Sequence, residues 1–200
     1  GQCIILHGEN GSGKSTVIEA SARLLPMEKG EIRHHLSMVH DYEGRRKSPK
    51  FPFGLTLQSN GLVPSQTIQQ HLETVCAISQ SSCDLTPILE SYGLSHRRHD
   101  KIAHLSGGQQ RKVSVISGLI PAMLNEKPRL ILLDEPDSWL DDSSIGVLKT
   151  HINQLRSAGH GILIATHDER LFECATSLHD LNKETKNEPE SCEPWEHIGS

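Results

Sequence analysis

IILHGENGSGKST, residues 4–16, is the stretch that decides how this chain folds. Its first residues belong to a short apolar run, Cys3–Leu6, which is typical of a buried strand. The glycines, lysine and serine that follow have the spacing G-x-x-x-x-G-K-[ST], which forms a phosphate-binding loop when it links a strand to a helix. Apolar residues recur at helical spacing after Gly13, so the sequence predicts that the chain begins as a strand–loop–helix unit.

The residue types in this loop suit the phosphates of a nucleotide. Glycines let the backbone curl so that its N–H groups point inward, and the helix N-terminus adds a partial positive charge. Lys14 is expected to reach the β- and γ-phosphates, Ser15 to place its hydroxyl on Mg²⁺, and Thr16 to bond the α-phosphate. The predicted nucleotide-binding residues are Gly8, Asn10, Gly11, Ser12, Gly13, Lys14, Ser15 and Thr16.

Composition limits the classes of protein to which the chain can belong. Its 200 residues suit one compact domain with a small insertion. The formal net charge of -5 does not indicate nucleic-acid binding, so no nucleic-acid partner is expected. No apolar run reaches the roughly 18 residues of a membrane span and no stretch resembles a secretory signal, so a membrane role would require a partner. Five cysteines without a CxxC pair argue against a disulfide framework and against a cysteine zinc site.

Strands and helices are predicted to alternate along the rest of the chain. Short apolar runs predict strands at about 30–33, 54–57, 129–133 and 161–166. Apolar stripes predict one helix from about Gly107 and another that Ser143 or Ser144 caps, and a short helix is expected over 169–175. This alternation is typical of the α/β class, in which helices flank both faces of a parallel sheet.

Two regions depart from this alternation. Residues 62–118 carry two apolar helical stripes, one with Ile68 and Leu72 and the other with Ile88, and they predict a small helical subdomain inserted in the core. Residues 179–200 are acidic and contain two prolines, which predicts a disordered tail. The main domain is therefore predicted to span residues 1–178.

A second glycine motif, LSGGQQR over Leu105–Arg111, opens the last helix of this predicted subdomain. Ser106 can cap that helix, so the chain would carry a second anion site, which makes sense if this site serves the nucleotide of another molecule. LSGGQ resembles the signature of the ATP-binding-cassette (ABC) ATPases, and GENGSGKST resembles their Walker A loop. The resemblance covers roughly residues 1–175 and implies a P-loop NTPase core with a small helical subdomain that carries the signature motif.

The next family motifs follow in family order, and the resemblance implies a role for each. Gln58 stands in the place of the Q-loop glutamine, and RLILLDE, residues 129–135, resembles Walker B. By this likeness, Mg²⁺ is held by Ser15, Gln58 and Asp134. Glu135 would orient and polarise the attacking water.

Two further segments complete the resemblance. His167 is similar to the switch histidine that contacts the γ-phosphate, so the implied catalytic residues are Glu135, His167 and Gln58. SWLD, Ser138–Asp141, resembles the D-loop, whose second family residue is commonly Ala where this chain has Trp139. We expect Trp139 to be a packing residue and Asp141 to be the D-loop aspartate.

The family mechanism implies how ATP and Mg²⁺ are used. Two cassettes, identical or different, would pair head to tail, and ATP on one phosphate loop would be clamped by the partner's signature. Hydrolysis would release the clamp, so the free energy of ATP hydrolysis would drive the opening and closing of a dimer. Transmembrane permease subunits are the expected partners, which implies a cytoplasmic protein on the inner face of the membrane. The signature residues expected to act on the partner's nucleotide are Ser106, Gly107, Gly108 and Gln109.

Three features depart from the family pattern. The family usually has a strand pair with an adenine-stacking aromatic residue before the first strand, so the chain is expected to be a fragment or a trimmed domain. The stretch from Ser106 to Asp134 is longer than usual, and Pro121 and residues 125–128 are expected to form an additional loop. Residues 33–52 match no family element, and residues 40–52 are expected to form an exposed loop.

The sequence leaves more than one function open. A transporter ATPase is favoured, and a compact chain of this kind resembles the heme-exporter ATPase of cytochrome c maturation. The alternative is a soluble ABC ATPase of translation, DNA repair or iron–sulfur assembly, although no second cassette or coiled-coil insertion is found. An inactive regulatory module is disfavoured because Glu135 and His167 are both present.

Overall fold

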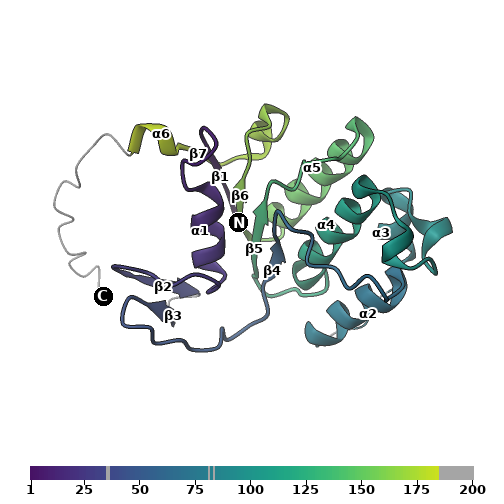
Figure 1. Ribbon diagram of the computed structural model, residues 1–200, viewed down its shortest axis with the longest axis horizontal. Coiled ribbons are helices and arrows are strands. Elements are labelled where there is room, and N and C mark those ends of the chain that lie inside the picture. Colours follow the sequence, from purple (N-terminus) through teal and green to yellow (C-terminus); the bar gives the residue numbers. More distant parts are fainter. Residues whose placement is uncertain (35–36, 81, 83, 185–200) are drawn as a thin grey trace.

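The computed structural model describes residues 1–34, 37–80, 82 and 84–184. Their main feature is a five-stranded sheet in which every neighbouring pair of strands is parallel (Figure 1). In spatial order the strands are β4 (Gly54–Thr56), β5 (Leu130–Asp134), β6 (Gly161–Ala165), β1 (Gln2–His7) and β7 (Ser177–Asp180).

Helices cover both faces of this sheet, as the predicted α/β fold requires. Helix α1 (Lys14–Ser21) lies on one face, and α4 (Gly107–Met123) and α5 (Asp142–Ser157) lie on the other (Figure 1). Successive side chains of a strand point to opposite faces. Leu132 of β5 accordingly packs with Ile18 of α1, while its neighbour Leu133 belongs to the cluster formed with α4 and α5. Central strands are apolar throughout because neither face meets water.

The predicted helical subdomain contains α2 (Ile68–Ile78), α3 (Thr86–Ser91) and the first part of α4. Thr67 begins α2 with a reciprocal capping box, since its hydroxyl accepts the N–H of Gln70 and the Gln70 side chain accepts the N–H of Thr67. One apolar cluster continues from α2 and α3 through α4 to the sheet. The boundary of the subdomain at residues 62–118 therefore stays a prediction.

Three local expectations were wrong. Pro121 lies inside the last turn of α4, where a proline costs only one hydrogen bond, and the Asn125 side chain bonds its carbonyl. Asp141, and neither of the two serines, caps α5, because its carboxylate accepts the N–H of Ser144 at 2.8 Å. The exposed loop expected over 40–52 begins later, because His40 and Asp41 are buried at the end of β3 (Ser37–Asp41), which pairs antiparallel with β2 (Glu31–His34), the strand predicted at about 30–33.

Residues 179–184, the first part of the predicted tail, have regular secondary structure. His179 and Asp180 end strand β7, which pairs with β1, and α6 (Leu181–Glu184) follows. Side-by-side pairing with a central strand satisfies the backbone groups of this segment, which composition alone did not reveal. The rest of the predicted tail, 185–200, lies outside the described residues. The short helix expected after β6 is a 3₁₀ helix over Glu169–Cys174.

Candidate functional site

The loop between β1 and α1 curls around the ammonium group of Lys14. Lys14 Nζ donates to the carbonyl oxygens of Gly8 and Glu9 at 2.8 and 2.9 Å. Gly11 and Gly13 have φ angles of 86° and 95°, and a Cβ at either position would meet nothing within 4 Å. These two positions therefore need glycine for the backbone angle and not for lack of space. The loop is closed around the lysine and begins a helix, which is the geometry of a phosphate-binding loop.

A residue of helix α6 is hydrogen-bonded to the outer side of this loop. Asn182 of α6 accepts the backbone N–H of Glu9 through its side-chain oxygen at 3.1 Å. A Cβ on Gly8 would lie 3.2 Å from the same oxygen, so the two segments are in close contact. Sequence reasoning missed Asn182, because it falls in the stretch that was assigned to the tail.

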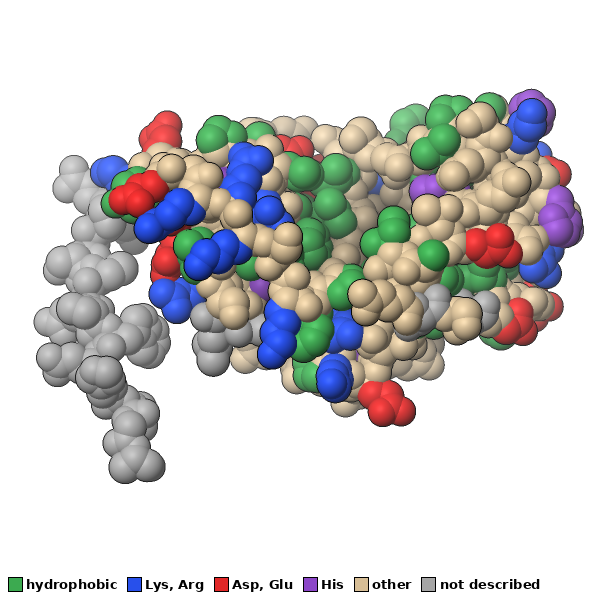
Figure 2. Space-filling model, turned by 90° about the horizontal axis from the view of Figure 1, so that it is seen from below, with side chains coloured by type: hydrophobic (Ala, Val, Ile, Leu, Met, Phe, Trp, Pro, Cys, Tyr) green, Lys and Arg blue, Asp and Glu red, His purple; other side chains and the backbone are tan. Residues whose placement is uncertain are grey.

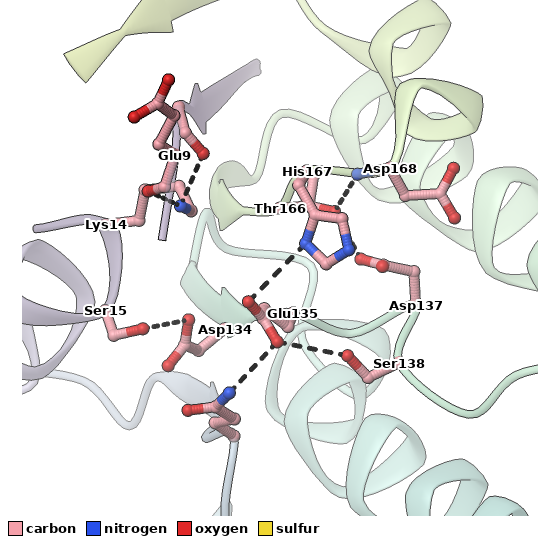
Figure 3. A network of polar contacts seen from close by, with 12 residues as sticks. Glu9, Lys14, Ser15, Asp134, Glu135, Asp137, Ser138, Thr166, His167 and Asp168 are labelled. Carbon is pink, nitrogen blue, oxygen red and sulfur yellow. Dashed lines mark hydrogen bonds and ion pairs between the residues drawn. The ribbon is translucent and has the colours of Figure 1, made fainter. Parts of the chain in front are cut away.

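Ser15 and Asp134 meet across the sheet edge. The Ser15 hydroxyl donates to Asp134 Oδ1 at 3.0 Å, while Asp134 Oδ2 is buried and has no hydrogen-bond partner (Figure 3). Burial raises the pKa of Asp134. An orphaned carboxylate oxygen beside a hydroxyl is a ligand set that suits Mg²⁺, because hard cations prefer oxygen donors. These residues therefore fit the cation that the sequence predicted.

Residues that follow the ends of three strands surround the Glu135 carboxylate (Figure 3). Its Oε2 accepts from Gln58 Nε2 at 3.2 Å and from the Ser138 hydroxyl at 3.3 Å, and its Oε1 lies 3.7 Å from His167 Nδ1. The backbone of Glu135 has a φ of 46°, which is strained for a residue other than glycine. The carboxylate is thus aimed by neighbours that follow β4, β5 and β6.

The phosphate loop and Glu135 face one cleft of about 370 Å³. Such a volume is within the usual range for small-molecule sites. None of the signature residues in the described part of the chain lines this cleft, and neither does Asp141. Its lining residues are Asn10, Gly11, Gly13, Lys14, Ser15, Thr16, Gln58, Glu135 and His167.

A buried guanidinium group holds the ends of two strands together. Arg111 of α4 is 1% exposed and donates to the carbonyl oxygens of Leu57, Asp134 and Glu135 and to the Asn60 side chain. Burial lowers its pKa. Sequence reasoning missed this role. The available signal was a basic residue on the apolar stripe of the predicted helix, where it must find acceptors inside the protein.

A second buried contact positions the backbone around His167. The Thr166 hydroxyl donates to Asp137 Oδ1 at 2.6 Å and accepts the N–H of Asp168 at 2.9 Å (Figure 3). Burial raises the pKa of Asp137. His167 itself is largely exposed to the cleft, and the residues on both sides of it are fixed. Asp137 and Thr166 were not among the predicted site residues.

The signature segment forms the N-terminus of α4. Ser106 caps it, since its hydroxyl accepts the N–H of Gln109 and the Gln109 side chain accepts the N–H of Ser106. A Cβ on Gly108 would lie 2.8 Å from the carbonyl oxygen of Trp139, so only glycine fits against the D-loop here. The signature turn therefore abuts the segment that follows Glu135.

Asp141, at the end of the D-loop, forms an ion pair with the helix that begins with the signature. Its carboxylate lies 2.9 Å from Lys112 Nζ on α4 while it caps α5. These hydrogen bonds, to Lys112 first and then to Ser144, lower the pKa of Asp141 to about 2. Trp139, in contrast, is not the packing residue that the sequence suggested, because its side chain is 83% exposed.

Comparisons with known proteins agree with this geometry, which defines a P-loop ATPase. A family model described as ABC transporter matches residues 1–138. The putative hemin import ATP-binding protein HrtA of Staphylococcus haemolyticus is 33% identical over 192 residues, which cover 90% of this chain and 83% of that protein. The glutamine transport ATP-binding protein GlnQ of Geobacillus stearothermophilus is 30% identical, with 84% and 70% of the two chains covered.

Solved structures give the same result. The ATP-binding subunit of an ABC transporter matches with a TM-score of 0.67 and 26% identity, over 83% of this chain and 68% of that one. The dimeric cassette MJ0796, bound to ADP and Pi, matches with a TM-score of 0.73 over 90% and 80% of the two chains, and at 19% identity this likeness concerns the fold alone. The chain belongs to the ABC transporter family. It is a transport ATPase, and the soluble alternative finds no support among these relatives.

No helix in the described ranges combines the length and the apolar character needed to cross a bilayer.

Proposed function

We propose that the cleft binds ATP with Mg²⁺ and hydrolyses it at the γ-phosphate. The observation that carries this proposal is the convergence of Gln58, Ser138 and His167 on Glu135, beside the Ser15–Asp134 pair. Lys14 and the N–H groups of the loop bind and orient the phosphates. Ser15, Gln58 and Asp134 would hold the cation, which would supply positive charge beside the phosphates.

Glu135 is the proposed general base. Its carboxylate accepts a proton from the attacking water while Gln58 and Ser138 keep one of its oxygens in place. His167 contacts the γ-phosphate from the end of β6 and lies near the other carboxylate oxygen. The strained backbone at Glu135 supports this role, because strain of this kind concentrates at functional positions.

Pairing of two cassettes completes the proposed site. The signature residues Ser106–Gln109 form a capped helix N-terminus that does not line the chain's own cleft. In a head-to-tail pair this helix end would meet the phosphates bound by the partner, and the anion would stabilise the closed state. Support comes from the dimeric cassettes that share this fold. The partner is a second copy or a related cassette.

A permease is the proposed membrane partner, which would hold the protein at the cytoplasmic face of the membrane. An apolar groove of about 360 Å³ opens between the segment around β4 and helices α2 and α4, close in sequence to Gln58. Apolar side chains gather near the middle of the face seen from below, and Lys and Arg side chains gather on the side of β2 and β3 (Figure 2). A short permease helix would fit this groove, whose lining includes Phe53, Leu55, Leu57, Val75 and Ile78.

The names of the relatives suggest which cargo to test first. HrtA is named for hemin import and GlnQ for glutamine transport, and more of the chain is shared with the former. We therefore propose a heme compound as the first cargo to test. The permease would set the direction of transport.

Two variants test the ATPase proposal. Glu135→Gln keeps a hydrogen-bonding side chain and loses the base, so ATP with Mg²⁺ should trap a dimer on gel filtration. Lys14→Ala should abolish turnover, and Tyr42→Ala, an exposed residue outside the cleft, should leave it unchanged. Unchanged ATP hydrolysis in Lys14→Ala would refute the site assignment.

A pull-down from the native membrane fraction tests the transport proposal. Recovery of a polytopic membrane protein with the tagged protein would support it, and the identity of that permease would define the cargo class. Recovery of ribosomes, DNA or a soluble assembly scaffold in its place would overturn the proposed partner and leave the ATPase chemistry intact.

A further inference from the structure

Trp139 has two features that folding alone does not explain. At 83% exposed it is more exposed than any other large hydrophobic side chain in the described residues. It also has a φ of 65°, in the left-handed region that disfavours residues with a Cβ. Exposed apolar surface and backbone strain both oppose stability in the isolated chain. A position that carries both is a candidate for function.

Hydrogen bonds hold the backbone on both sides of Trp139, so the place of its Cα in the turn is fixed. The N–H of Ser138 donates to the Glu135 carbonyl oxygen, and the N–H of Leu140 donates to that of Asp137, both at 3.0 Å. Leu140 is buried, and the residue after it caps α5. The strained turn is therefore anchored on both sides, and its tryptophan side chain is exposed to solvent.

The position of this turn identifies its surroundings. On one side, the Ser138 hydroxyl bonds the Glu135 carboxylate in the nucleotide cleft. On the other side, the carbonyl oxygen of Trp139 lies against Gly108 of the signature turn. Trp139 thus stands between the two halves of the proposed composite site, and these halves act on nucleotides bound to different chains.

We infer that Trp139 is an anchor in the interface with a second cassette, and that its indole becomes buried there when ATP closes the pair. The inference rests on the proposed head-to-tail dimer. Rigid tryptophans near the centre of an interface commonly contribute a large share of the binding energy, because they bury a large area at low entropic cost. The same burial explains why the chain keeps an exposed indole on a strained backbone.

Fluorescence tests burial directly, because the chain has only two tryptophans, Trp139 and Trp195. In the double variant Glu135→Gln, Trp195→Phe, the remaining indole reports on position 139 alone. Addition of ATP and Mg²⁺ should shift its emission to shorter wavelength in step with dimer formation measured by analytical ultracentrifugation. A dimer with unchanged emission would overturn this inference and leave the proposed function standing, whereas a chain that stays monomeric would overturn both.

Affinity provides the second measurement. In the Glu135→Gln background, Trp139→Ala should raise the dissociation constant of the ATP-bound dimer at least about ten-fold, while Trp139→Phe should keep most of the affinity. Tyr42→Ala is the matched control, since it removes an aromatic side chain that is 57% exposed outside the turn. ATP affinity of the monomer should be the same in all three. Equal dimer affinity for Trp139→Ala and Tyr42→Ala would refute the anchor.

Discussion

Replacement of Arg111 by methionine tests whether a buried guanidinium holds the catalytic segment in place. The change keeps an unbranched side chain of similar length and removes four hydrogen bonds. Three of them go to the carbonyl oxygens of Leu57, Asp134 and Glu135, at 2.5 to 2.7 Å. The Glu135 carbonyl oxygen keeps the backbone N–H of Ser138 as a donor, so the loss falls mainly on the carbonyl oxygens of Leu57 and Asp134.

The expected loss of stability follows from these contacts. Each buried acceptor that loses its partner costs about 1–3 kcal/mol. Part of this loss is offset, because methionine carries no charge that must be desolvated, and that penalty is on the order of several kcal/mol. A net loss of about 2–4 kcal/mol is therefore expected. For a chain of this size it corresponds to a melting temperature lower by roughly 5–15 °C.

Thermal unfolding followed by circular dichroism measures this loss. Lys112→Met is the matched control, because it removes a cation at the next position of the same helix. The ion pair of Lys112 with Asp141 involves a carboxylate that is 60% exposed, and such pairs contribute at most about 1 kcal/mol. ATP hydrolysis is then compared at a temperature where both variants are folded, and it should be lower in Arg111→Met.

Two outcomes would contradict the reasoning, one about stability and one about activity. If Arg111→Met is no less stable than Lys112→Met, the carbonyl oxygens have found other partners and the guanidinium is not what fixes this segment. If stability falls and the rate of ATP hydrolysis per folded molecule does not, Arg111 stabilises the fold without positioning Glu135.

Three further substitutions test other contacts by urea unfolding. Thr166→Val should cost about 1–3 kcal/mol at neutral pH and less in acid, because the hydroxyl bonds Asp137 most strongly when that carboxylate is ionised, whereas Thr150→Val at an exposed hydroxyl should cost little. Gly54→Ala should cost roughly 2–4 kcal/mol, since its Cβ would lie 1.8 Å from a carbonyl oxygen of α4, and no loss would contradict that packing. Asp141→Ala should cost about 1 kcal/mol by loss of the helix cap, and the difference should vanish as pH falls from 3.8 to about 2.

Local patterns explain what could be predicted from the sequence. Strands β1, β5 and β6 are built on short apolar runs and the phosphate loop is a fixed spacing of glycines before a helix, and each is decided by neighbours in sequence. The α/β fold and the family were therefore predicted and confirmed. Lys14, Glu135 and His167 are among the expected site residues that line one cleft, whereas the signature residues and Asp141 do not line it, and all individual roles stay predictions.

Contacts between distant positions explain what could not be predicted. Asn182 reaches Glu9 across 173 positions, and no local pattern separates it from an acidic tail. Arg111 meets Leu57 across 54 positions, so its role depends on how α4 packs against β4. The exposure of Trp139 was missed for a related reason, because an aromatic residue in a turn is normally a packing residue unless the backbone directs it outward.

The same long-range contacts suggest how closure of a dimer would reach the chemistry. The helix that begins with the signature carries Arg111 one turn later, and Arg111 bonds the carbonyl oxygen of Glu135. In the first turn of that helix, Gly108 lies against the carbonyl oxygen of Trp139. The hydroxyl of the neighbouring Ser138 donates to the Glu135 carboxylate. In the proposed dimer, a partner nucleotide that orders the start of α4 would therefore reach the Glu135 carboxylate through two sets of contacts. Such an arrangement would make each site sensitive to its neighbour, as the proposed alternation between open and closed states requires.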